Sequence, residues 1–191
     1  THAHEDHIGG IVDLWDHIRC PIYATPFTAA VVRRKFAESK HATQPQFKIF
    51  PNGSRFEVGP FDVEMIPITH STVESHSVVL RTPEGAILHT GDWKLDPQPL
   101  LGPKTAESRF KALGDERVLA VVGDSTNAQI PGWSSSEGEV RERLIDLISQ
   151  ENNRVACACF SSNIARLATF FEIARATNRH PVLVGRSLLR M

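Results

Sequence analysis

The chain begins Thr1-His2-Ala3-His4-Glu5-Asp6-His7, a segment with three imidazoles and two carboxylates in six positions. Nitrogen and oxygen ligands at this density are typical of zinc sites. Alternate residues of an extended segment point to the same side, so His2 and His4 are expected to share one ion. The adjacent Asp6 and His7 can turn toward a second ion. The segment therefore predicts a site for two metal ions rather than a polar terminus or the remnant of an expression tag.

Two polar residues further along the chain follow predicted strands. His70 ends the run of residues 63–69, and Asp92 follows residues 87–91. Strands are rigid, and sites are commonly assembled where they end. His70 is therefore predicted as a third ligand of the first ion, and Asp92 as a carboxylate that bridges both ions. Either residue alone would more often be a turn residue, so the assignment depends on their occurring together and in this order.

The first ninety residues combine helices with short strands. Apolar spacing over residues 8–18 predicts a helix, residues 21–25 a buried strand, and Pro26 the start of a second helix that ends near residue 40. Short β-rich runs then alternate with turns that contain proline and glycine, a pattern that predicts an antiparallel or mixed sheet. These runs are residues 47–50, 55–58, 61–68, 77–81 and 86–90.

The last third of the chain has a different pattern. After a proline-rich loop, residues 118–123 form a continuous apolar run that predicts a strand. Beyond it, predicted helices alternate with predicted strands, which indicates a separate α/β unit. The helices are residues 137–150 and 163–177, and the strands are residues 154–160 and 181–184. The composition changes near residues 131–136, where we expect the junction between two domains.

Composition and charge limit the classes of partner. With 191 residues and 41% hydrophobic content, the chain is long enough to bury a core. A net charge of −1 gives no overall attraction to nucleic acid or to anionic membranes, so a polyanion has to bind at a local cluster. Three cysteines form no even disulfide framework, and a cytoplasmic protein without a membrane partner is expected. The first residue is Thr1 rather than Met, and we expect the chain to be cut at both ends.

The metal motifs resemble those of a known family. Residues 1–7 match the H-x-H-x-D-H signature of the metallo-β-lactamase superfamily, and His70 and Gly91-Asp92 match its next two metal motifs. Longer strings resemble the β-CASP branch and, within it, the ribonuclease J family. These strings are residues 70–75, 89–96, 123–128, 160–163 and 184–187.

The resemblance implies a particular α/β fold. Residues 1–133 would form part of a metallo-β-lactamase αββα sandwich, and residues 134–191 would begin a β-CASP α/β domain. The chain would then be a central piece of a longer protein. The last zinc-binding histidine of the family and its β-CASP phosphate-binding histidine motif have no counterpart here, so the second zinc site would be incomplete within the chain.

The resemblance also implies roles for individual residues. His2, His4 and His70 would hold one Zn²⁺, Asp6 and His7 the other, and Asp92 would bridge the two ions, with Mn²⁺ as an alternative metal. Asp124 would be the acidic residue at the entrance to the β-CASP domain. The expected catalytic residues are accordingly Asp6, His7, Asp92 and Asp124.

The expected reaction is hydrolysis of RNA phosphodiester bonds, since zinc ions lower the pKa of bound water and stabilise negative charge at phosphorus. The resemblance implies endonuclease and 5′-to-3′ exonuclease action on single-stranded RNA with a 5′ monophosphate, in RNA processing and decay, by a dimer or tetramer. Two alternatives stay open. One is a hydrolase of a small ester, lactone or thioester; the other is an inactive metal-binding or interaction piece.

Weaker signals concern substrate binding. Ser161, Ser162 and Asn163 lie at a predicted strand-to-helix junction, where free amides and hydroxyls can hold a phosphate, although a helix N-cap explains them equally well. Lys94, Arg166 and Arg186 are candidates for positive charge along an RNA path. Cys157 and Cys159 should face one side of a strand and pack in a core.

Overall fold

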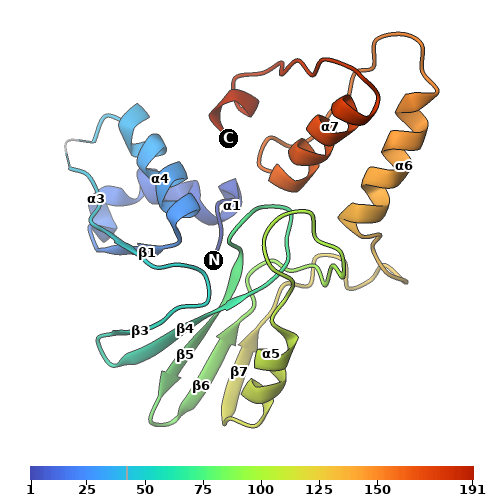
Figure 1. The fold of residues 1–191 in the computed structure, drawn as a ribbon. Helices are drawn as coiled ribbons and strands as arrows, with labels where there is room; N and C mark the ends of the chain where they lie inside the picture. Colours follow the sequence, from blue (N-terminus) through green and yellow to red (C-terminus); the bar gives the residue numbers. More distant parts are fainter. Residues whose placement is uncertain (42) are drawn as a thin grey trace.

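The computed structural model describes residues 1–41 and 43–191 and has a mixed α/β fold (Figure 1). Its main feature is a five-stranded sheet in which the strands follow their order in the chain. Neighbouring strands are antiparallel from β3 to β6, whereas β6 and β7 are parallel. The strands are β3 (Arg55–Val58), β4 (Phe61–Pro67), β5 (His76–Thr82), β6 (Gly85–His89) and β7 (Val118–Val122). The predicted mixed sheet is confirmed for the runs from residue 55 onward, whereas the run at residues 47–50 lies in a separate two-stranded sheet.

Helix α5 (Glu107–Gly114) covers one face of this sheet. Its Leu113 is buried against Ile66, Val79 and Ala86 of the central strands. The sequence pattern did not indicate this helix, because Phe110 and Leu113 are its only large apolar residues and eight residues are too few for a clear helical period. The helix nevertheless buries the apolar side of β4, β5 and β6.

Ion pairs also hold α5 against this face of the sheet. Arg81 of β5 bonds to Glu64 of β4 and to Glu116, which precedes the first residue of β7 by two positions. Arg109 of α5 bonds to the same two carboxylates. The guanidinium groups of Arg81 and Arg109 lower the pKa of Glu116 to about 2. Helix α5 is therefore attached to the sheet by charge as well as by apolar contact.

The N-terminal elements form a second layer. They are α1 (Glu5–Ile8), α2 (Gly10–Asp13), α3 (Trp15–Ile18), β1 (Ile22–Ala24), α4 (Pro26–Glu38) and β2 (Phe47–Ile49), and β1 pairs with β2 in parallel. Their core contains Ile8, Trp15, Val32 and Phe36. The prediction of one helix over residues 8–18 was wrong, because the segment forms separate four-residue helices. Gly9 and Gly10 favour the interruption, since glycine is a poor helix residue.

The C-terminal helices agree with prediction, but the strands between them do not. Helices α6 (Glu137–Ser149) and α7 (Ile164–Ala176) differ from the predicted ranges by one residue at their ends. In contrast, residues 154–160 and 181–184 are not strands, and Cys157 is exposed rather than packed in a core. Cys159 is half-buried. A short 3₁₀ helix, η1 (Leu188–Arg190), lies near the C-terminal end of the described residues. A strand requires a hydrogen-bonded neighbour, and the described residues supply none to these segments.

The layers meet at one end of the sheet. Figure 1 shows α1–α4 and α6–α7 on opposite sides of that end, with the N-terminal segment between them. Residues 123–136 connect β7 to α6 without a helix or strand, and the domain boundary near residue 133 stays a prediction. Among the described residues, no helix has the length and apolar character needed to cross a membrane.

Candidate metal centre

Three segments bring the predicted ligands to one edge of the sheet. Strands β4 and β6 both run antiparallel to β5 between them, so their C-terminal ends lie at the same edge. His70 follows β4 and Asp92 follows β6. The N-terminal segment is attached to this edge by a hydrogen bond of 3.2 Å from the His76 amide to the Thr1 carbonyl oxygen. The edge therefore receives His2 and His4 as well.

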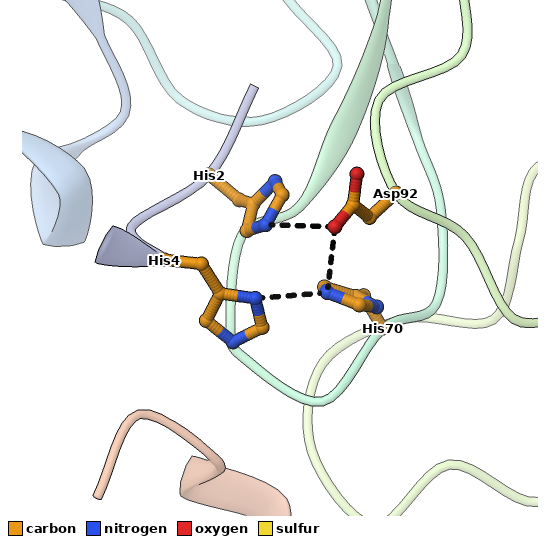
Figure 2. Close-up of side chains that lie close together, drawn as sticks. All are labelled: His2, His4, His70 and Asp92. Atoms are coloured by element: carbon orange, nitrogen blue, oxygen red, sulfur yellow. Dashed lines mark hydrogen bonds and ion pairs between the residues drawn. The ribbon is translucent and has the colours of Figure 1, made fainter. Parts of the chain in front are cut away.

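The first cluster consists of His2, His4, His70 and Asp92, whose side chains point toward one another (Figure 2). His4 Nδ1 lies 3.0 Å from His70 Nε2. Asp92 Oδ2 lies 3.8 Å from His2 Nε2 and also 3.8 Å from His70 Nε2. One ligand atom from each residue falls within 4.8 Å of the others, which is the spacing that donors around one ion require.

The second cluster consists of Asp6, His7 and Asp92. His7 Nε2 lies 3.1 Å from Asp92 Oδ1 and 3.6 Å from Asp6 Oδ2. Asp92 thus directs one oxygen toward each cluster. The structure brings together all six residues predicted as ligands, in the two groups that the sequence suggested.

The donor atoms fit a metal ion. His2 is fully buried, and its Nε2 has no hydrogen-bond partner within the part of the chain that the structure describes. Burial and the neighbouring histidines lower the pKa of His2 to about 2. Burial also lowers the pKa of His70 to about 4, with a contribution from His4. These imidazoles are therefore neutral at pH 7, the form in which a ring nitrogen donates to a metal.

Hydroxyl groups contact the imidazole nitrogens that face away from the two clusters and so orient the rings. Thr1 Oγ1 lies 3.1 Å from His2 Nδ1 and 3.3 Å from His7 Nδ1, which leaves the Nε2 atom of both rings directed at the clusters. Ser71 Oγ lies 3.3 Å from His4 Nε2. Burial lowers the pKa of His4, and a hydrogen bond to the backbone of Ser162 partly opposes this effect. Sequence patterns did not indicate the roles of Thr1 and Ser71, because hydroxyl residues are common in loops.

The turn before Asp92 requires glycine. Gly91 has φ = 61°, and a Cβ atom there would lie 3.0 Å from the His76 carbonyl oxygen and 3.1 Å from Thr1 Cβ. The Gly91 amide donates to His89 Nδ1 over 3.0 Å, so His89 shapes this turn without belonging to either cluster. Only a residue without a side chain lets Asp92 approach the N-terminal segment this closely.

Thr69 joins the Asp92 loop to the end of β4. The Thr69 carbonyl oxygen accepts from the Lys94 amide at 2.9 Å, and its hydroxyl oxygen accepts from the Asp96 amide at 3.1 Å. The Thr69 hydroxyl also contacts the Lys94 carbonyl oxygen. Since His70 follows Thr69 directly, these bonds fix Asp92 and His70 relative to each other.

Asp124 lies beside the clusters and is a member of neither. Its amide donates to Thr90 Oγ1 at 3.0 Å, which places it next to the turn that carries Asp92. Burial raises the pKa of Asp124, but hydrogen bonds from Thr126 and from the backbone of Trp93 outweigh this effect and lower it below its usual value. The Asp124 carboxylate also acts electrostatically on His70. Its catalytic role stays a prediction.

The proposed phosphate-binding residues lie at the start of α7. Asn163 caps this helix, because its Oδ1 accepts from the Arg166 amide at 2.9 Å. Ser161 and Ser162 are half-buried in the turn before it. The N-cap interpretation of Asn163 is confirmed, and a phosphate-binding role stays a prediction.

Two of the three cations predicted along an RNA path are engaged elsewhere. Lys94 Nζ lies 3.5 Å from Glu137 Oε1, and Arg166 Nη2 lies 3.2 Å from Glu137 Oε2. Glu137 thus pairs with both cations, and a contribution of Lys94 and Arg166 to RNA binding stays a prediction. Arg186 is exposed.

Comparison with known proteins supports this interpretation of the fold. The family described as the beta-lactamase superfamily domain matches residues 1–111. The chain is 46% identical over its whole length to ribonuclease J of Sinorhizobium meliloti and 40% identical over its whole length to ribonuclease J of Mycolicibacterium smegmatis. It is 37% identical, over 98% of its length, to ribonuclease J 1 of Streptococcus pyogenes. The chain covers 34%, 34% and 33% of these relatives, or about a third of each.

A solved structure shows a similar fold. The crystal structure of a protein of unknown function from Enterococcus faecalis V583 matches 82% of this chain with a TM-score of 0.62 and 17% sequence identity, and 43% of that protein is covered. This likeness concerns the fold alone. The family match covers more than half of the chain and includes every residue of both clusters. The chain therefore belongs to the beta-lactamase superfamily.

Proposed function

We propose that the full-length protein is a metal-dependent ribonuclease of the ribonuclease J type. One observation carries the proposal: two groups of ligand residues share Asp92, in a chain whose relatives include ribonuclease J at 46% identity. Carboxylate-bridged pairs of metal ions are a recurrent arrangement in enzymes that hydrolyse phosphodiester bonds. The proposed substrate is single-stranded RNA with a 5′ monophosphate.

The proposed cofactors are two Zn²⁺ ions, with Mn²⁺ as the alternative. His2, His4 and His70 would hold one ion, Asp6 and His7 the other, and Asp92 both. When bound, the ions would lower the pKa of a water molecule and stabilise negative charge at phosphorus. Imidazole and carboxylate donors without a thiolate suit either metal.

Residues around the clusters have separate proposed roles. Asp124, held ionised by its hydrogen bonds, would orient the imidazole of His70 and the approaching substrate through its charge. Ser161, Ser162 and Asn163 would contact a phosphate of the RNA, since the start of α7 is attached at Ala165 to Ser71, which in turn contacts His4. The junction before α7 therefore lies within reach of any substrate that occupies the metal centre.

We further propose endonuclease and 5′-to-3′ exonuclease action in RNA processing and decay, in the cytoplasm, by a dimer or tetramer of the full-length protein. Figure 1 shows the N-terminal helices on one side of this end of the sheet and α7 on the other, and we propose that a flexible single strand fits between them better than a duplex. A duplex is a wide rod that requires an open groove.

The test is cleavage of a 5′-monophosphorylated single-stranded RNA by the full-length protein. We expect release of nucleotides or short fragments that stops with a chelator and resumes when zinc or manganese is restored. Asp6→Ala should reduce turnover strongly, whereas Glu5→Ala should not. Glu5 is the adjacent carboxylate, but it pairs with Lys35 over 2.6 Å and belongs to neither cluster.

The alternatives give different results. A protein that contains two metal ions but cleaves only small esters, lactones or thioesters would replace the ribonuclease proposal with a small-molecule hydrolase. A protein that neither binds metal nor cleaves RNA would be an inactive interaction piece. Equal turnover of the Asp6→Ala and Glu5→Ala variants would contradict the assignment of the second cluster.

A further inference from the structure

Glu137 connects parts of the chain that are distant in sequence. It is the first residue of α6, and its side chain is only 12% exposed. Arg166 of α7 donates to both of its carboxylate oxygens at 3.2 Å. On the other side, Lys94 Nζ lies 3.5 Å from its Oε1. One carboxylate thus contacts α7 and the loop that carries Asp92.

Asp96 makes a second connection between the same loop and α6. Its side chain is 4% exposed, and its Oδ2 accepts from the Glu137 amide at 2.8 Å. Lys94 Nζ lies 3.7 Å from the same oxygen. The start of α6 also packs tightly on this loop, because a Cβ atom at Gly138 would lie 2.9 Å from Gln98 Oε1.

The N-terminus of α7 also contacts the residues around the metal centre. The Ala165 amide donates to the Ser71 carbonyl oxygen at 3.3 Å, and Ser71 Oγ lies 3.3 Å from His4 Nε2. Helix α7 is therefore held at the metal centre by Ala165 and at Glu137 by the adjacent Arg166. The Asp92 loop, α6, α7 and His4 form a closed ring of contacts.

We propose that Glu137 is a positioning residue that couples the Asp92 loop to α7 and thereby sets where Ser161, Ser162 and Asn163 lie relative to the metal centre. The inference rests on the proposed ribonuclease function, because these residues are the proposed phosphate contacts. Glu137 itself touches neither a metal ligand nor the substrate.

The geometry explains why a carboxylate is needed at this position. Lys94 and Arg166 approach each other across Glu137, and without its charge two cations would face each other in a half-buried place. Asp96 cannot replace it, since Asp96 pairs with Lys94 but has no contact with Arg166 among the described residues. Loss of the charge should therefore separate α7 from the loop rather than rearrange either one internally.

The chain offers a matched control. Glu172 of α7 pairs with Arg141 of α6 over 3.1 Å, so this ion pair also joins the two helices. Neither Glu172 nor Arg141 makes an ion pair or side-chain hydrogen bond with the Asp92 loop among the described residues. Glu137→Gln and Glu172→Gln each remove one carboxylate from an α6–α7 ion pair, and only the first also removes an ion pair with Lys94 of the Asp92 loop.

The experiment measures amide hydrogen exchange and RNA cleavage with the metal-loaded full-length protein. In Glu137→Gln we expect exchange to rise on the order of tenfold in residues 91–96 and 161–166 together, with no such rise in Glu172→Gln. For 5′-monophosphorylated RNA we expect KM to rise roughly tenfold in Glu137→Gln while kcat changes by less than about threefold. Lys94→Met breaks the connection from the loop side, and adding it to Glu137→Gln should add little.

The outcomes separate the inference from the proposed function. If the wild-type protein does not cleave RNA, the ribonuclease proposal fails, and the exchange data alone decide whether Glu137 couples the two segments. Exchange that rises equally in the Glu137 and Glu172 variants would overturn the coupling and assign Glu137 a general structural role. A fall in kcat with unchanged KM would also overturn it. If Glu137→Gln does not fold, Lys94→Met supplies the same comparison.

Discussion

The metal-binding edge of the sheet and the segments around α7 differ in how completely they are buried. At the edge, His2 is 0% exposed and Ser75 and Ser77 are 1% exposed. In the C-terminal segments, Phe160, Val182 and Val184 are 84%, 79% and 82% exposed. Both regions contain apolar runs that the sequence presents as strands, but only the first forms them within the described chain.

The difference shows which structural features are encoded by neighbouring residues in the sequence. Helix α6 begins where Ser136 accepts from the Glu139 amide, and α7 begins where Asn163 accepts from the Arg166 amide. Such caps lie within four residues of sequence, so the starts of these helices can be predicted from local sequence. A strand depends on a neighbour that can be far away in the chain. The C-terminal segments therefore have the composition of strands, but no hydrogen-bonded partner strand among the residues that the structure describes.

The largest effect should follow from removing the residue that both clusters share. Asp92→Ala in the full-length protein should lower metal content and reduce RNA cleavage by at least about a hundredfold, more than loss of a residue that only orients a ligand. Metal analysis and single-turnover cleavage provide the measurement. Asp13→Ala removes an exposed carboxylate of α2 and should retain both properties. A variant at Asp92 that keeps two metals would show that the clusters do not depend on a bridge.

The same comparison explains what the sequence could predict of the site. His2, His4, Asp6 and His7 lie in one short segment, and His70 and Asp92 each follow a strand, so spacing alone indicated them. The interactions that orient them were not predictable in this way. Glu137 is 45 residues beyond Asp92, as counted along the sequence, and only the folded chain shows that Lys94 and Arg166 meet at its carboxylate.

The fold shows the same limit. The sheet was predictable because turns with glycine and proline separate its strands, whereas helix α5 was missed because it has only two large apolar residues. The residues that hold it in place, Glu64 and Arg109, are 45 positions apart and give no local signal. Tertiary contacts stabilise this helix more than its own sequence does.

Substitutions in the core of the sheet and in the exposed C-terminal segment should differ in their effect on the free energy of unfolding. Leu113→Ala should lower the free energy of unfolding by about 2–5 kcal/mol, because Leu113 is 2% exposed and packs on the sheet. Val182→Ala should change it by less than about 0.5 kcal/mol, because this side chain is 79% exposed. Urea unfolding followed by circular dichroism measures both. Similar losses would mean that Val182 is covered in solution.

A glycine substitution tests the crowding at the metal-binding edge. Gly91→Ala should cost about 1–3 kcal/mol and weaken metal binding roughly tenfold, because the new Cβ atom would meet His76 and Thr1 and displace Asp92. Gly102→Ala is the matched control. Gly102 has φ = 73°, but a Cβ atom there would meet nothing within 4 Å, so only the left-handed backbone should cost stability, about 1–2 kcal/mol. Equal metal affinities in the two variants would contradict the close approach at Gly91.

The smallest effect concerns pH and the ion pairs that fasten α5. Arg81 and Arg109 lower the pKa of Glu116 to about 2 from its usual 4.5, so between these values the unfolded chain binds more protons than the folded one. The stabilisation is complete above pH 4.5 and is lost as the pH falls toward 2. Because the Glu116 side chain is 32% exposed, solvent screening keeps the effect below about 1 kcal/mol.

Glu116→Gln should therefore unfold with a weaker pH dependence than the wild type between pH 4.5 and 2, and the two proteins should converge at the acid end. Urea midpoints measured at several pH values provide the comparison, with about 1 M NaCl as the control, since salt should reduce the difference by screening a partly exposed network. Parallel pH profiles for the two proteins would show that Arg81 and Arg109 hold α5 through Glu64 alone. That result would assign the attachment of α5 to the ion pairs of Glu64 in β4, a carboxylate that is 8% exposed.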